Sequence, residues 1–109
     1  MKDIDIAKVE ILDSGQVAVS PAVADDLYQY IYRAAEGVEW VSREGRFLSP
    51  SRYMLGAPFP LTAAQRFQNL AGAAISELGV RLRVSSNTEW IDVPPEVRRE
   101  IEATYLSSK

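Results

Sequence analysis

The sequence predicts an α+β fold, in which hairpin strands form an antiparallel sheet and a central helix packs on one face of it. Helix signals agree over about 62–78, and two pairs of strand-like segments flank short turns that contain glycine. After Gly79 the apolar period changes from 3.6 to 2, which indicates that a strand follows the central helix. Two further helices are predicted over about 22–36 and 95–106. The 109 residues, 47% of them apolar, predict one domain spanning 1–109.

The chain begins with a predicted hairpin over 7–12 and 16–20. Between these segments lies Asp13-Ser14-Gly15, in which the aspartate can bond the backbone ahead of it and the glycine can adopt a positive φ. The helix over 22–36 follows, with helical spacing of its apolar residues. Its residues 28–32 are rich in tyrosine and also suit a strand, so the sequence leaves both structures open there.

A second hairpin is predicted over 38–42 and 46–49, again around a turn that ends in glycine. The segment from Pro50 to Pro60 holds three prolines, which interrupt both ladders and helices. Because this segment also contains several large apolar residues, we expect a packed loop.

Thr62 and Gln65 have the spacing of a capping box at the start of the central helix. Its apolar residues form one stripe, and Arg66 falls outside that stripe. Gly79 is expected to end the helix in a left-handed conformation. The stripe consists of Ala63, Phe67, Leu70, Ala71, Ala74, Ile75 and Leu78.

Two strands, over 80–85 and 88–93, are predicted after this helix. In the first, Arg81 and Arg83 alternate with apolar residues and should project from the face of the sheet opposite the helix. In the second, Trp90 is expected to point inward. Pro94-Pro95 then opens the final helix.

The composition excludes several classes of function. The chain has neither cysteine nor histidine, which removes thiolate nucleophiles, disulfides and the commonest general base and metal ligand. We therefore predict no catalytic residue, no metal and no cofactor, although catalysis stays open. The acidic pI of 4.9 and the lack of a recognisable motif argue against nucleic acid. Without a long apolar segment, no membrane span is predicted, and we expect a cytoplasmic protein.

Three parts of the sequence carry a family resemblance: the segment 30–38 with Trp40, the segment 77–82, and 88–90 with Val93-Pro94. Together they resemble small α+β proteins of unassigned function carried on bacterial integron gene cassettes. The resemblance implies a bacterial accessory protein and offers no catalytic motif to carry over. Because members of this varied group often self-associate, it also implies that this chain forms a homodimer.

Large aromatic and arginine side chains are the candidate binding residues, because both types are common in interfaces. The tryptophans also suit the core, and the arginines also suit a solvated face paired with nearby acids. The candidates for a ligand or partner are Tyr32, Arg33, Trp40, Arg81, Arg83 and Trp90.

Two hypotheses of function follow. The first is a protein that acts by binding or self-association, without catalysis, through the strand layer; its partner is a second copy or an unidentified protein. The alternative is a small-molecule-binding protein or enzyme, with a pocket between the central helix, the Pro50 to Pro60 loop and the Trp40 strand. The polar groups of that pocket would be Tyr32, Arg33, Glu39 and Arg83.

Overall fold

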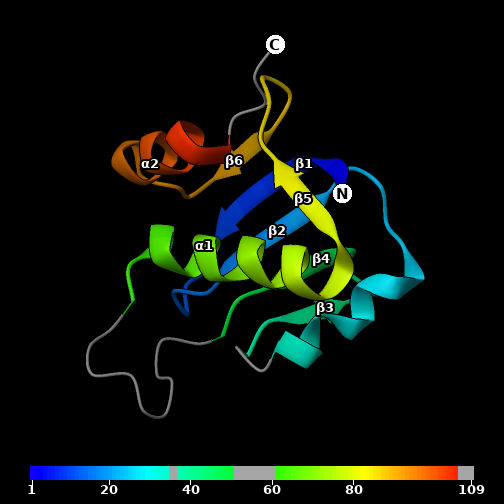
Figure 1. Cartoon of the computed structure of the whole chain (residues 1–109). Coiled ribbons are helices and arrows are strands. Elements are labelled where there is room, and N and C mark those ends of the chain that lie inside the picture. Colours follow the sequence, from blue (N-terminus) through cyan, green and yellow to red (C-terminus); the bar gives the residue numbers. More distant parts are fainter. Residues whose placement is uncertain (35–36, 51–60, 106–109) are drawn as a thin grey trace.

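A six-stranded sheet forms the centre of the computed structural model, which describes residues 1–34, 37–50 and 61–105 (Figure 1). The sheet together with its helices confirms the α+β class. The strands are β1 (Lys2–Ile11), β2 (Val17–Pro21), β3 (Glu39–Val41), β4 (Arg46–Leu48), β5 (Val80–Arg83) and β6 (Glu89–Ile91). Their order is β3-β4-β2-β1-β5, and β6 also pairs with β1.

The two predicted hairpins are present. β1 and β2 pair antiparallel, as do β3 and β4, and β2 joins the hairpins by pairing antiparallel with β4. Gly15, with a φ of 85°, and Gly45, with a φ of 66°, supply the left-handed conformation in the two turns. The segment 51–60, which holds most of the predicted proline-rich loop, lies outside the described residues.

The prediction of a wholly antiparallel sheet is wrong, because β5 and β6 both run parallel to β1. The central helix carries the chain across one face and returns it beside β1, so β5 enters the sheet in the direction of β1. β5 pairs with the first half of β1 and β6 with the second half. A register shift between Ile6 and Lys8 lies between the two pairings.

The central helix α1 (Ala63–Ala73) continues into one π-helical turn, η2 (Ala74–Leu78), so the predicted range of 62–78 is confirmed. The capping box is also confirmed. Gln65 donates its backbone N–H to Thr62 Oγ1 at 3.1 Å, and the Thr62 N–H donates to Gln65 Oε1 at 2.9 Å. Gly79 ends the helix with a φ of 65°.

The helix predicted over 22–36 is the shorter 3₁₀ helix η1 (Asp26–Ala34). It starts at Asp26 because Asp25 caps it: Asp25 Oδ1 accepts a hydrogen bond from the N–H of Leu27, an N–H that has no partner within the first helical turn. Tyr28 and Ile31 are buried one 3₁₀ turn apart, so this tyrosine-rich segment is helical. The final helix α2 (Pro95–Tyr105) confirms the prediction up to 105; residue 106 lies outside the described residues.

All of these helices lie on the same face of the sheet. In Figure 1, α1 crosses in front of the strands, and the contacts of α1 with α2 and of η1 with η2 place the other helices in that layer. The core lies between the two layers. Its largest fully buried side chains include Ile6, Val9, Val17, Val19, Phe47 and Leu82 from the sheet and Ile31, Phe67 and Leu70 from the helices.

Candidate functional site

Of the two candidate aromatic residues near η1, Trp40 packs in an aromatic cluster and Tyr32 is exposed. Trp40 is half-buried, with its ring centroid 5.2 Å from that of Tyr28 and 4.8 Å from that of Phe47. Burial raises the pKa of Tyr28, and the negative charge of Asp25 raises that pKa further. Tyr32, by contrast, is 61% exposed. Trp40 therefore belongs to the edge of the core, whereas Tyr32 is open to solvent.

Arg33 also lies on η1, with its guanidinium carbon 4.5 Å from the centroid of the Tyr30 ring. Trp90 lies on β6, at the edge of the sheet opposite to β3. The guanidinium carbon of Arg98, from α2, stacks over Trp90 at 5.0 Å from the ring centroid. The structure therefore does not bring Trp40 and Trp90 into one site.

Arg81 and Arg83 lie on the sheet face that faces away from the helix layer, as predicted. Both approach Asp3, with distances of 3.7 Å from Arg81 Nη1 and 3.9 Å from Arg83 Nε to its carboxylate. Arg46 lies on the same face and pairs with Glu10 at 3.3 Å. The position of these arginines is thus established, and their role in binding stays a prediction.

We name this surface the open face, because no helix in the described part of the chain covers it. Strand pairing and side-chain alternation assign its members. They are Asp3, Asp5, Lys8, Glu10, Ala18, Ser20, Glu39, Val41, Arg46, Leu48, Arg81, Arg83, Glu89 and Ile91.

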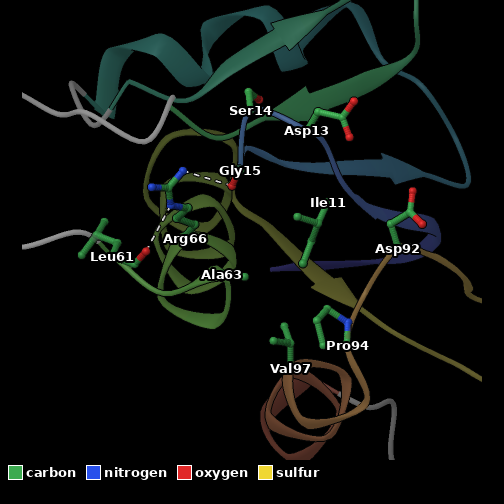
Figure 2. A pocket seen from close by; sticks show the side chains of 10 residues that line it. All are labelled: Ile11, Asp13, Ser14, Gly15, Leu61, Ala63, Arg66, Asp92, Pro94 and Val97. Atoms are coloured by element: carbon green, nitrogen blue, oxygen red, sulfur yellow. Dashed lines mark hydrogen bonds between the residues drawn. The ribbon is translucent and has the colours of Figure 1, made fainter.

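A separate pocket of about 420 Å³, which we name the end pocket, lies where three segments meet (Figure 2). These segments are the β1–β2 turn, the start of α1 and the link from β6 to α2. None of the candidate residues from the sequence lines it. Its lining residues are Ile11, Asp13, Ser14, Gly15, Leu61, Ala63, Arg66, Asp92, Pro94 and Val97.

Arg66 is buried at one side of the end pocket, with 5% of its surface exposed. The apolar stripe placed this residue outside the core, but carbonyl groups of the β1–β2 turn, of Pro50 and of Leu61 surround it and act as acceptors. Nη1 donates to the Gly15 oxygen at 3.1 Å and to the Pro50 oxygen at 3.4 Å, and Nε donates to the Leu61 oxygen at 3.4 Å. Within residues 1–34, 37–50 and 61–105, no carboxylate forms an ion pair with this guanidinium.

Two exposed carboxylates, those of Asp13 and Asp92, lie on the side of the end pocket away from Arg66 (Figure 2). Asp92 has a φ of 55° and is the one non-glycine residue with a positive φ in the described part of the chain. This conformation costs an L-residue roughly 1–2 kcal/mol, which is smallest for aspartate and asparagine. The turn residue Asp13 was visible in the sequence, but nothing there indicated that Asp13, Arg66 and Asp92 line one pocket.

The described residues contain no group of three or more acidic side chains that could hold a metal ion. In the same ranges, no helix combines the length and the apolar character needed to cross a membrane. The polar groups of the end pocket are the guanidinium of Arg66, the carboxylates of Asp13 and Asp92, the hydroxyl of Ser14 and backbone groups.

Comparisons with known proteins agree with the resemblance seen in the sequence. The model of the family described as "Integron Cassette Protein Hfx_Cass5" matches residues 4–88. A solved structure of the integron cassette protein Hfx_Cass5, from the mobile metagenome of North West Arm Sewage Outfall, is 34% identical. The match covers 96% of this chain and 97% of that chain, with a TM-score of 0.42. No curated protein matches. The chain belongs to the Hfx_Cass5 family of integron cassette proteins.

Proposed function

We propose that this chain acts by binding, without catalysis, and that it forms a homodimer through its open face. The observation that carries the proposal is a sheet with helices on one face and, in the described residues, none on the other. An uncovered sheet face with apolar residues among its charges favours contact with another protein surface. We also propose a cytoplasmic location and no nucleic-acid partner, as expected from the sequence.

The chemistry of the open face suits a second copy of the same chain. Half-buried apolar side chains of Val41, Leu48 and Ile91 lie among acidic and basic residues that are nearly equal in number. Two such faces therefore have little net repulsion, although the whole chain has a net charge of -3. Arginine supplies most of the basic groups, and this residue is enriched in protein interfaces.

Sedimentation velocity at low micromolar concentration tests the proposal. The wild-type chain should sediment with a mass near twice 12.1 kDa. Arg83→Glu and Leu48→Lys, both on the open face, should shift the mass toward that of the monomer. Arg99→Glu makes the same charge change on the exposed surface of α2 and should leave the dimer intact. A wild-type monomer throughout this range would exclude the homodimer.

A further inference from the structure

We propose that the end pocket binds a small zwitterion whose ammonium and carboxylate groups are separated by an apolar chain. The inference concerns a different surface from the open face and does not depend on self-association. It starts from the separation of charge in Figure 2, where Arg66 lies at one side of the pocket and both carboxylates at the other.

The side that would receive the ammonium group is formed by Asp13 and Asp92. Both side chains are exposed, and neither forms an ion pair with a described basic residue. They come from two different connections, the β1–β2 turn and the link after β6, and both line the same pocket. Two carboxylates acting together on one ammonium group provide charge-assisted hydrogen bonds.

The side that would receive the carboxylate group is formed by Arg66 and the first turn of α1. The guanidinium has carbonyl partners only, so its positive charge is not neutralised by a described carboxylate. Ala63, the first residue of the eleven-residue helix α1, lines the pocket beside it. The positive end of the helix dipole therefore adds to the charge of Arg66.

The middle of the pocket is apolar. In Figure 2, Ile11 lies between Arg66 and Asp92, and Ala63, Pro94 and Val97 lie below them; these four lining residues would contact a short methylene chain. The volume of about 420 Å³ falls within the range typical of small-molecule sites.

The distribution of charge also argues against simpler ligands. A free anion would meet Asp13 and Asp92, and a free cation would meet Arg66 at the opposite side. Each of these ligands leaves one side of the pocket without a charge partner. A ligand with both charges satisfies both sides, and the distance between its charges has to span the apolar middle.

A titration with 6-aminohexanoate, followed by ¹H–¹⁵N correlation spectra of the full chain, tests the proposal. Hexanoate and hexylamine are the matched probes, because each keeps the apolar chain and one of the two charges. We expect saturable shifts at the amides of Ser14, Gly15 and Asp92. We also expect each single-charge probe to bind at least about tenfold more weakly, since one charged contact is lost.

Two variants test the side of the pocket that would bind the ammonium group, and a third is the control. Asp13→Asn and Asp92→Asn should each weaken 6-aminohexanoate several-fold without weakening hexanoate; asparagine also tolerates the left-handed conformation of residue 92. Asp26→Asn, at an exposed residue of η1 outside the pocket, is the control and should change the affinity for neither 6-aminohexanoate nor hexanoate.

Three results would overturn the proposal. The first is no saturable shift of pocket amides at about 10 mM 6-aminohexanoate, where even a millimolar site would be mostly filled. The second is equal binding of hexylamine, which would show a cation site only. The third is equal binding of hexanoate, which would show that the two aspartates contribute nothing.

Discussion

Thr88 Oγ1 donates a hydrogen bond to the carbonyl oxygen of Ile6, 2.7 Å away and 82 residues earlier in the sequence. The same hydroxyl accepts a hydrogen bond from the N–H of Ser85 at 2.9 Å. Thr88 therefore satisfies two backbone groups at the point where β1 changes its neighbour from β5 to β6. One buried side chain thus links the two parallel pairings of the sheet.

Replacing this hydroxyl by a methyl group should destabilise the fold. Thr88→Val leaves the buried Ile6 carbonyl and the Ser85 N–H without their partner, and we expect a loss of about 1–3 kcal/mol in the free energy of unfolding. Urea denaturation followed by circular dichroism measures this change. Thr88→Ser keeps the hydroxyl and is expected to lose less; equal losses in both variants would show that the hydrogen bonds are not the cause.

The buried face of α1 gives a second prediction. Leu70 is fully buried, and Leu70→Ala should lower the free energy of unfolding by about 2–5 kcal/mol because it leaves a cavity against the sheet. Gln68 is exposed on the same helix, and Gln68→Ala should change that energy by no more than about 0.5 kcal/mol. Similar losses in the two variants would contradict the assigned orientation of the helix.

The raised pKa of Tyr28 predicts a loss of stability at high pH. The folded state binds the phenol proton more tightly than the unfolded state, whose pKa is near 10.0, so the stabilisation is complete below that value. It is lost as the pH rises through the higher folded pKa. Urea denaturation between about pH 9 and pH 11 should show a steeper fall for the wild type than for Tyr28→Phe.

The exposed Tyr32 provides the matched control for this measurement. Tyr32→Phe should keep the alkaline loss of the wild type, because its side chain is largely in water in the folded state. If Tyr28→Phe and the wild type lost stability in parallel, burial of Tyr28 would not contribute to the pH dependence.

Duplex DNA should not bind this chain tightly. The net charge is -3, and three of the arginines that could contact phosphate already lie beside Asp3 or Glu10. We expect no dissociation constant below about 10 µM at physiological salt, since affinity for duplexes depends on neutralising phosphates. Tight binding that weakens steeply with salt in a gel-shift titration would contradict this prediction.

Local signals in the sequence were sufficient to predict most of the helices and strands. The Thr62 and Gln65 capping box and the left-handed Gly79 fixed both ends of the central helix, because each depends on neighbouring residues only. The direction of β5 and β6 depends on how the chain crosses the sheet. Hairpin patterns carry no information about that crossing, and the prediction of an antiparallel sheet failed there.

The end pocket was not predictable for a related reason. Helical periodicity placed Arg66 among solvent-facing residues, and only the folded β1–β2 turn provides the Gly15 carbonyl that allows its burial. Asp92 follows a short strand and had no distinctive local pattern. The placement of Arg81 and Arg83 on the open face was predictable, because strand alternation alone determines which face a side chain occupies.

The divided pairing of β1 determines when the fold can be completed during synthesis. Once the first fifty residues have left the ribosome, both hairpins can form, yet one side of β1 has no neighbour until residues 80–91 emerge. Until then, the backbone groups of that side are an unpaired template for any extended chain nearby. The last third of the sequence therefore protects the first strand from misassociation, and truncated chains should aggregate before they can fold.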